Sequence, residues 1–218
     1  MKLVVFDVDG TLIDSQHHIV GAMNAAFADA GLPPLDRGQI LRIVGLSLPV
    51  AVAELAAAQP PALQGRIVEG YRRAFMQARL IAAAPLYPGA RDCLDLLAGR
   101  GDILLALATG KSRRGVAAMI AAHGLTGRFA SIQTADDHPS KPHPAMLLAA
   151  LSETGVEVGE AVMVGDTSFD MDMARAAGIA ALGVGWGYHP PEALRASGAA
   201  DVAADFGELG RVLARWAA

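Results

Sequence analysis

The chain has 218 residues, of which 53% are hydrophobic and 18% charged, and its formal net charge is −4. This length suits one large domain, or one domain that carries a small second one, with a core that needs no disulfides. No stretch resembles the roughly 20 apolar residues of a membrane-spanning helix, and the acidic balance argues against nucleic acid, so neither a membrane nor a nucleic acid is expected as partner.

The first predicted element is a strand over Lys2–Phe6, and a long helical region follows it. Residues 15–84 show no strand pattern. Apolar residues recur there at helical spacing before Gly31, again up to Val44, and then over Pro49–Ala58 and Pro61–Ala83. We therefore predict an α-helical cap over residues 15–84, inserted into a core made of residues 1–14 and 85–218.

After the insert, strand and helix patterns alternate. The further predicted strands are Ile103–Ala108, Phe129–Ile132, Ala161–Val164 and Ala180–Val184. Helices are predicted between them and before them, over Gly89–Ala98, Arg114–His123, Pro144–Glu153 and Phe169–Ala177. Nearly continuous apolar strands are typical of parallel sheets covered on both faces. The pattern predicts an α/β fold with a Rossmann-like, doubly wound parallel sheet.

The single cysteine, Cys93, cannot form an internal disulfide, and the leucines around it predict a buried thiol. A chain without disulfides fits a reducing compartment. The first apolar run reaches Asp7 too soon to be the apolar region of a signal peptide. We therefore expect a cytoplasmic protein.

Polar residues follow four of the predicted strands at the point where each strand ends or shortly after it. They are Asp7, Asp9, Gly10 and Thr11 after the first strand, Thr109, Gly110 and Lys111 after the second, Lys141 after the third, and Asp166 and Asp170 after the fourth. In an open α/β sheet, ligands bind outside the carboxyl ends of the strands. The fold therefore predicts that these groups meet at one edge.

The spacing of these residues predicts a phosphate site with a metal ion. Asp7 and Asp9 point to the same side of an extended segment. Gly10 permits a tight turn, in which the backbone amides of Gly10 and Thr11 could face an anion. Carboxylates gathered at one edge repel each other, and a divalent cation removes the conflict. An oxygen-liganded site of this size suits Mg²⁺, while Thr109 and Lys141 could donate to phosphoryl oxygens.

The segments DVDGTL, LATGK, SKPHP and GDTSFD resemble, in that order, the four motifs of the haloacid dehalogenase superfamily. The helical insert matches the subgroup with a helical cap. The stretches GDTSFDMDMARAAG and YPGARDCLDLLAGRG are similar to phosphoglycolate-phosphatase-like members. The resemblance covers essentially the whole chain.

The resemblance implies a Mg²⁺-dependent phosphatase that acts on a small phosphorylated metabolite. Asp7 would attack phosphorus and carry an aspartyl-phosphate, while Asp9 would serve as acid and then as base. Thr109 and Lys141 would hold the phosphoryl group, with Gly10, Thr11, Gly110 and Lys111 as further phosphate-binding or substrate-binding candidates. The metal would be held by Asp7, the backbone carbonyl of Asp9, and Asp166, with Asp170 nearby. Members that act on halides lack the second Asp of the first motif, so Asp9 favours phosphoryl chemistry.

Three alternatives remain open at this stage. A phosphomutase of the β-phosphoglucomutase kind would share the core, but residues 15–84 offer no clear second acid or base. A receiver-type signalling domain lacks room for the insert and needs an Asp on the third strand. A non-catalytic binding module would leave the repulsion among the carboxylates unexplained.

Several segments around the predicted site have weaker expectations. Gly45–Leu48 is the best candidate for a loop that faces the substrate, and Gly183–Gly187 is interpreted as a turn-rich loop at the edge of the site. Lys111 and Arg113 are candidates for substrate contact. Ser15 and Ala84–Leu86 are the expected hinge of the cap.

Overall fold

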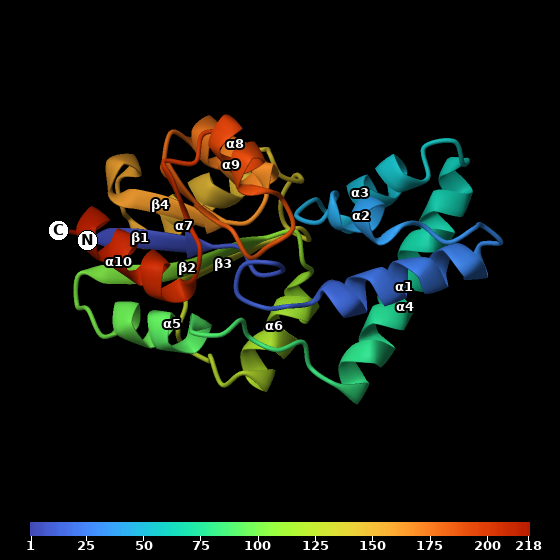
Figure 1. Cartoon of the computed structure of the whole chain (residues 1–218), viewed down its shortest axis with the longest axis horizontal. Coiled ribbons are helices and arrows are strands. Elements are labelled where there is room, and N and C mark those ends of the chain that lie inside the picture. Colours follow the sequence, from blue (N-terminus) through green and yellow to red (C-terminus); the bar gives the residue numbers. More distant parts are fainter.

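A computed structural model describes all residues, 1–218, as a parallel sheet flanked by helices and joined to a helical bundle (Figure 1). The six strands lie in the order β3-β2-β1-β4-β5-β6, and all pairings are parallel. Their bounds are β1 Lys2–Phe6, β2 Ile103–Thr109, β3 Ser131–Thr134, β4 Ala161–Gly165, β5 Ala180–Val184 and β6 Asp201–Ala203. The predicted fold class is confirmed.

Alternate residues of each central strand enter two separate cores, one on each face of the sheet. In β1, Val4 and Phe6 face one core, while Leu3 and Val5 face the other. The side-chain period of two in a strand explains this division. Because both faces are covered by helices, the strands are apolar along their whole length, as the sequence indicated.

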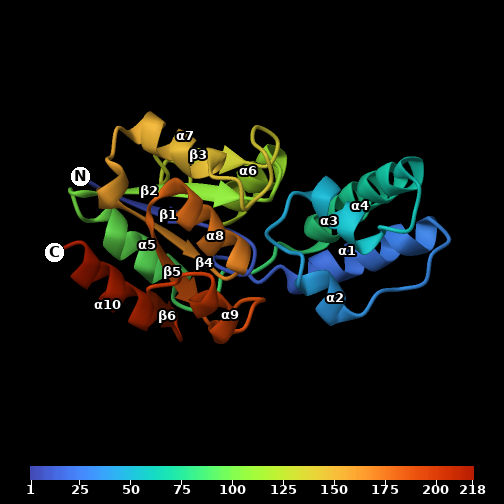
Figure 2. The same ribbon diagram turned by 90° about the horizontal axis from the view of Figure 1, so that it is seen from above.

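Figure 2 shows the strands side by side from β3 to β6. Six helices cover the sheet, three on each face (Figure 1). Helices α5 (Ala90–Ala98), α6 (Arg113–Ala122) and α10 (Phe206–Trp216) pack on one face. The other face is covered by α7 (Ala145–Thr154) and α8 (Ser168–Ala177), with α9 (Pro191–Ala196) near the edge. No helix of the structure is both long and apolar enough to cross a membrane.

The insertion after β1 is helical, as predicted. Its helices are α1 (Gln16–Asp29), α2 (Arg37–Leu41), α3 (Leu48–Leu55) and α4 (Pro61–Ile81). They enclose a third apolar core, in which α1 packs along α4. The bundle lies beyond the carboxyl ends of the strands, at the right of Figure 1. It therefore faces the edge where the polar residues collect.

The chain crosses between sheet and bundle twice, and the two crossings run side by side. The amide of Asp14 donates to the carbonyl of Pro85 at 2.9 Å, and that of Tyr87 donates to Leu12 at 3.0 Å. Ile13 and Leu86 form an antiparallel bridge between these bonds. This paired linker includes Pro85 and Leu86 of the expected hinge and ends next to Ser15. The hinge, and the extent of the cap over residues 15–84, stay predictions.

The third strand and the C-terminal elements differ from the sequence-based expectation. The strand expected over Phe129–Ile132 lies over Ser131–Thr134, two residues later. Its pairing with β2 decides the boundary, because Ala106 lies opposite Ser131. The sequence analysis missed β6, α9 and α10, of which β6 is only three residues long.

The order of the strands places the functional edge at one particular position. The chain winds outward from β1 to β3 in one direction and from β4 to β6 in the other. Loops that leave β1 and β4 therefore diverge and leave a crevice at their carboxyl ends, which is where such sheets bind ligands. Asp7 and Asp166 follow these two strands.

The buried core of the bundle gives a prediction about stability. Ile67 of α4 is completely buried, so Ile67→Ala should lower the free energy of unfolding by about 2–5 kcal/mol. Leu80 lies on the same helix but is 77% exposed, so Leu80→Ala should change it by less than about 0.5 kcal/mol. Urea unfolding followed by circular dichroism measures both values. Equal losses in the two variants would contradict this packing.

Candidate active site

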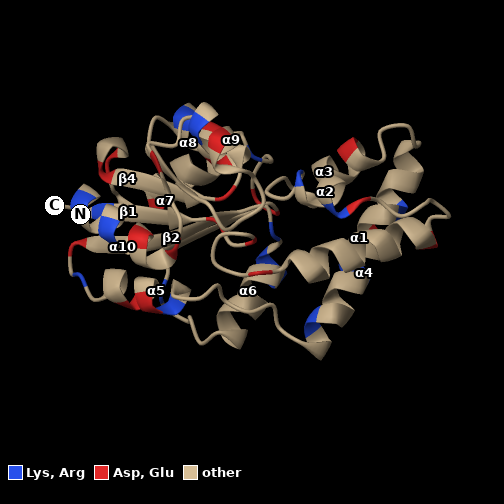
Figure 3. Ribbon diagram, in the orientation of Figure 1, with Lys and Arg blue, Asp and Glu red and all other residues tan.

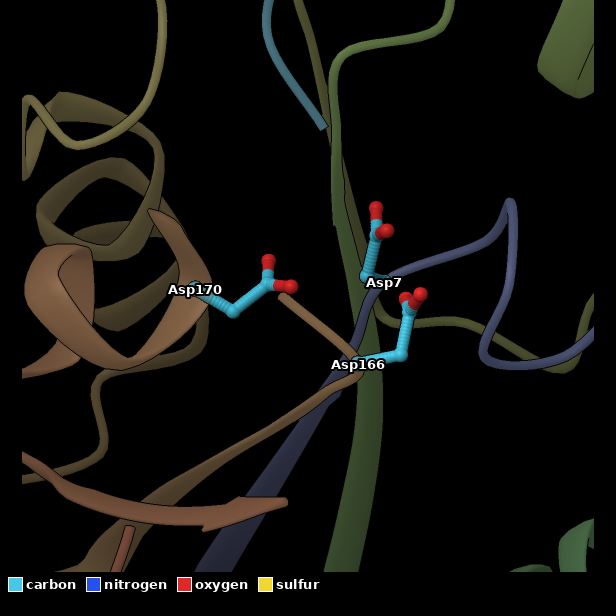
Figure 4. A group of neighbouring side chains, drawn as sticks. All are labelled: Asp7, Asp166 and Asp170. Atoms are coloured by element: carbon cyan, nitrogen blue, oxygen red, sulfur yellow. The ribbon is translucent and has the colours of Figure 1, made fainter. Parts of the chain in front are cut away.

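Three buried aspartates from different elements meet at the crevice (Figure 4). Asp7 follows β1, Asp166 follows β4, and Asp170 lies in the first turn of α8. One carboxylate oxygen from each lies within 4.8 Å of the other two. Figure 3 shows acidic segments where the strands end, on the side that faces the bundle. Residues of the first and fourth predicted motifs thus lie together, as expected.

A single lysine lies among these carboxylates. Lys141, also buried, places Nζ 2.6 Å from Asp170 and 2.9 Å from Asp7. Burial alone would lower its pKa, but the charges of Asp170 and Asp7 outweigh this and raise it, so the side chain stays an ammonium. One positive charge therefore pairs with two of the three carboxyl groups, Asp7 and Asp170.

The Asp7 carboxylate is buried without hydrogen bonds. Its Oδ1 lies close to Lys141, but neither oxygen accepts a hydrogen bond in acceptable geometry. Burial raises its pKa to about 6 against the pull of Lys141, and the charge of Asp170 adds to the rise. Buried polar atoms without partners are rare, so these two oxygens are available to a ligand that the protein does not itself supply.

Asp166 and Asp170 are held by their own surroundings. Asp166 accepts a hydrogen bond from Thr11 Oγ1 at 2.9 Å and one from the amide of Tyr188 at 2.9 Å. Burial raises its pKa well above 3.8, and the charges of Asp7 and Asp170 raise it further. Asp170 accepts from the amide and the hydroxyl of Thr167, in a capping box that begins α8. Both carboxylates are therefore fixed in direction.

Three glycines leave the space that these carboxylates occupy. A Cβ on Gly187 would lie 2.1 Å from Asp166 Cβ, and one on Gly165 would lie 2.4 Å from Asp170 Cγ. A Cβ on Gly10 would lie 2.2 Å from Asp166 Oδ2, and its φ of +87° also favours glycine. The loop with Gly187, expected at the edge of the site, thus packs directly on Asp166.

These residues fit a small divalent cation. The donor atoms are carboxylate oxygens, the three side chains converge, and neither Asp7 oxygen accepts a hydrogen bond, although Oδ1 forms an ion pair with Lys141. Hard oxygen ligands in a compact site are what Mg²⁺ prefers. The carboxylate of Asp9 does not join this group; it accepts from Ser15 Oγ and from Lys111 Nζ, at 2.8 and 2.7 Å to its two oxygens. Only its backbone carbonyl remains a proposed ligand.

The predicted phosphate-binding residues occupy varied positions. Thr109 is buried at the end of β2, and its hydroxyl accepts from the amide of Lys111 at 3.2 Å. The amide of Gly10 donates to Ile13 and that of Thr11 to Val8, so neither is free to face an anion. The amides of Val8 and Asp9, in contrast, donate to no protein acceptor. The sequence analysis missed Val8, because only the backbone of an apolar residue is involved.

A cavity of about 460 Å³ lies between the strand ends and the bundle. Asp7, Asp9 and Thr109 line it from the sheet, with Gly110 and Lys111. The loop Gly45–Leu48 lines it from the bundle, as expected. Arg113 does not line it; its guanidinium pairs with Asp137 at 2.6 Å.

A family model described as haloacid dehalogenase-like hydrolase matches residues 4–184. The chain belongs to this family. The expected family and its enzyme class are thereby confirmed.

Individual relatives cover most of this haloacid dehalogenase-like chain. It is 39% identical to "Probable phosphatase IndB" of Dickeya dadantii over 89% of this chain and 86% of that one. It is 36% identical to the phosphoglycolate phosphatase of Rhodospirillum rubrum over 96% of this chain and 89% of the other. The solved structure of a hydrolase from Pseudomonas syringae superposes with a TM-score of 0.89 at 26% identity, with 100% of both chains covered.

The raised pKa of Asp7 predicts how metal binding depends on pH. Below about pH 6 the carboxyl is protonated, so a cation must displace the proton. Mg²⁺ should therefore raise the melting temperature clearly at pH 7.5 and much less at pH 5. Differential scanning fluorimetry with and without 5–10 mM Mg²⁺, on the order of typical assay conditions, measures this, with KCl of equal ionic strength as control. An equal shift at both pH values would contradict the assignment.

The raised pKa of Asp7 also makes the free energy of unfolding of the metal-free protein depend on pH. Between the ordinary pKa of 3.8 and about 6, the folded chain holds a proton on Asp7 that the unfolded chain releases. Stability rises with pH only where the unfolded state binds more protons, which is the reverse of this case. The contribution of Asp7 to the free energy of unfolding should therefore fall as pH rises through this window, and Asp7→Asn should remove that slope in urea unfolding.

Gly187 gives a second test of whether Asp7, Asp166 and Asp170 bind a metal ion. Gly187→Ala places a Cβ against Asp166, so we expect at least a roughly 10-fold loss of Mg²⁺ affinity, as for other changes behind a metal ligand. Isothermal titration calorimetry measures it. Gly159→Ala is the matched control, because nothing lies within 4 Å of its added Cβ. Unchanged affinity in the Gly187 variant would show that Asp166 is not a ligand.

Proposed function

We propose that this chain is a Mg²⁺-dependent phosphatase that hydrolyses a small phosphate monoester through an aspartyl-phosphate on Asp7. One observation carries the proposal. Asp7 is buried, lines the cavity, and has two carboxylate oxygens without hydrogen bonds. A carboxylate that an ion pair holds in place, but that accepts no hydrogen bonds, is suited to act as nucleophile.

Asp7, Asp166 and Asp170, with the carbonyl of Asp9, would hold the metal ion. When bound, Mg²⁺ would balance the excess carboxylate charge and draw negative charge from the phosphoryl group. The protein side chains then have separate tasks. Lys141 orients Asp7 and Asp170 through its ion pairs and neutralises part of their charge.

In the first step, an oxygen of Asp7 forms a bond to phosphorus and the ester P–O bond breaks. The proton of a protonated Asp9 goes to the departing alkoxide, which leaves as an alcohol. In the second step, Asp9 takes a proton from water as that water attacks phosphorus. The bond to Asp7 breaks, and inorganic phosphate leaves with the carboxylate of Asp7 restored.

The phosphoryl oxygens need donors near Asp7. The amides of Val8 and Asp9 are unpaired, and Thr109 lines the cavity beside them. Donors fixed in place before the reaction stabilise charge that develops on the phosphoryl group. We assign these three groups to phosphoryl binding together with Lys141.

The lining of the cavity supports hydrolysis over a phosphomutase. The residues of the bundle that line it include no Asp, Glu, His or Lys. A phosphomutase of the β-phosphoglucomutase kind would need the substrate to be turned and phosphorylated again, and the bundle offers no carboxylate or imidazole to assist. Water is therefore the acceptor that this lining favours.

Ser15, at the end of the linker, contacts the proposed acid and base, Asp9. Its hydroxyl donates to Asp9 and lies 3.2 Å from the hydroxyl of Tyr188, instead of capping α1. We propose that the cap, residues 15–84, moves on this linker and that its position excludes bulk water. The first substrate to assay is phosphoglycolate, because several relatives are named phosphoglycolate phosphatase.

Asp7→Asn should lower kcat/KM by at least about 10³-fold, because an amide cannot act as the nucleophile. Release of inorganic phosphate from a panel of phosphate esters with Mg²⁺ measures it, and EDTA should remove activity in a way that Mg²⁺ restores. Asp102→Asn is the matched control, since Asp102 is exposed and precedes β2 at the opposite end of the sheet. Full activity of the Asp7 variant would overturn the mechanism.

A further inference from the structure

The cavity has two chemically different sides. The sheet side carries Asp7, Asp9, Thr109 and Lys111, which serve the reaction described above. The bundle side is mostly apolar: of the 11 hydrophobic residues that line the cavity, all except Ala135 come from the bundle. They are Ile19, Met23, Ile43, Val44, Leu46, Leu48, Ala51, Tyr71, Phe75 and Met76. A phosphoryl group has no use for this surface, so it faces the rest of the substrate.

Two aromatic rings form the centre of the apolar side. Tyr71 and Phe75 lie one turn apart on α4 and stack, with centroids 5.6 Å apart and planes at 22°. Both are only partly buried and both line the cavity. Lys111 Nζ, which pairs with Asp9, lies 4.9 Å from the centroid of Phe75. Only the Lys111 side chain thus separates Phe75 from the carboxylate of Asp9.

In this structure the bundle contacts the sheet domain around the same cavity. The amide of Ser47 donates to Ser140 Oγ at 2.8 Å, and His189 Nε2 lies 3.0 Å from the carbonyl of Arg42. A Cβ on Gly110 would lie 2.6 Å from the carbonyl oxygens of Gly45 and Leu46. The apolar side therefore stands opposite Asp7 while the cavity keeps its volume.

That volume exceeds the needs of a two-carbon phosphate. The 460 Å³ of the cavity corresponds to roughly 15 water molecules at about 30 Å³ each. It falls within the range of about 300–1,000 Å³ for pockets that enclose larger organic ligands. A substrate as small and polar as phosphoglycolate would leave most of the apolar lining against water.

Resting on the proposed function, we infer that the preferred substrate is a phosphate monoester whose alcohol carries a flat, largely apolar ring. The phosphate lies at Asp7 and the ring lies against Phe75 and Tyr71. Stacked aromatic contacts and burial of apolar surface both favour such a ring over water.

The competing assignment is a substrate with a second anionic group. Arg72, Arg79 and Arg114 also line the cavity, and a carboxylate could pair with them. Arg72 already forms an ion pair with Glu69 at 2.5 Å, whereas Arg114 contacts the sulfur of Met76. The experiment therefore includes phosphoglycolate as the small anionic alternative.

The test compares 2-phenylethyl phosphate with ethyl phosphate. Both release a primary alkoxide, so the chemistry of the leaving group is the same and the ratio of their kcat/KM values reports on the ring. We expect a ratio of at least about 10 in the wild type, in the range found when apolar groups fill a pocket. We also expect 2-phenylethyl phosphate to exceed phosphoglycolate.

Variants of Phe75 test whether the aromatic pair is responsible for the ratio of the two kcat/KM values. Phe75→Ala should bring the ratio close to 1, and Phe75→Leu, which keeps an apolar side chain, should lower it at least about 3-fold by loss of stacking. Leu80→Ala on the same helix is the matched control and should keep the wild-type ratio, because Leu80 is exposed and does not line the cavity. Melting temperatures verify that each variant is folded, and Phe75→Leu remains the test if the alanine variant is not.

The outcomes separate this inference from the proposed function. Hydrolysis of ethyl phosphate or phosphoglycolate with a ratio near 1, or a preference for phosphoglycolate, overturns the ring assignment and leaves the phosphatase in place. Absence of Mg²⁺-dependent phosphate release from all three esters overturns the proposed function itself. A wild-type ratio that Phe75→Leu leaves unchanged assigns the preference to another part of the cavity and also overturns the inference.

Discussion

The gathering of three buried carboxyl groups beside a single buried lysine is the constraint on which the rest of this structure depends. Burial and mutual repulsion raise the pKa values of Asp7 and Asp166, and Lys141 offsets only part of the charge. Such a cluster is stable only if its geometry is imposed from outside. The capping box of α8, the Thr11 hydroxyl and the Tyr188 amide impose it, and Gly10, Gly165 and Gly187 leave the room. The same excess of charge is what gives a cation its affinity.

The topology of the sheet determines which groups enter this cluster. Because β1 and β4 are neighbours although about 160 residues separate them, Asp7 and Asp166 meet without any side chain having to cross the core. The same switch point sends the chain after β1 away from the sheet, which gives space for the helical insertion. The insertion therefore returns above the one edge where its lining can meet a substrate.

The sequence allowed the fold and the main reactive residues to be predicted, since these depend on apolar runs and on the residues at their ends. The remaining features depend on contacts across the chain. Gly187 has no local signal for its role, which is set by Asp166, a residue more than twenty positions earlier that follows a different strand. The pairing of Asp9 with Lys111 likewise requires β1 and β2 to be aligned. The displaced start of β3 shows the same limit, because its pairing with β2, and not its composition, decides where it begins.

The separation of charge and apolar surface across the cavity has a consequence for how such an enzyme can change. Every group to which we assign a part in the reaction lies on the sheet side, where the charges of Asp7, Lys141 and Asp166 influence one another. The lining from the bundle includes no Asp, Glu, His or Lys, and Tyr71 and Phe75 form no ion pairs with the carboxylates. Substitutions there can alter the shape of the substrate site without changing the charge at the reacting centre. In the proposed reaction, selectivity for the alcohol and chemistry at phosphorus are therefore carried by different surfaces, which meet at Lys111, in contact with both Asp9 and Phe75, and at Ser15, which donates to Asp9.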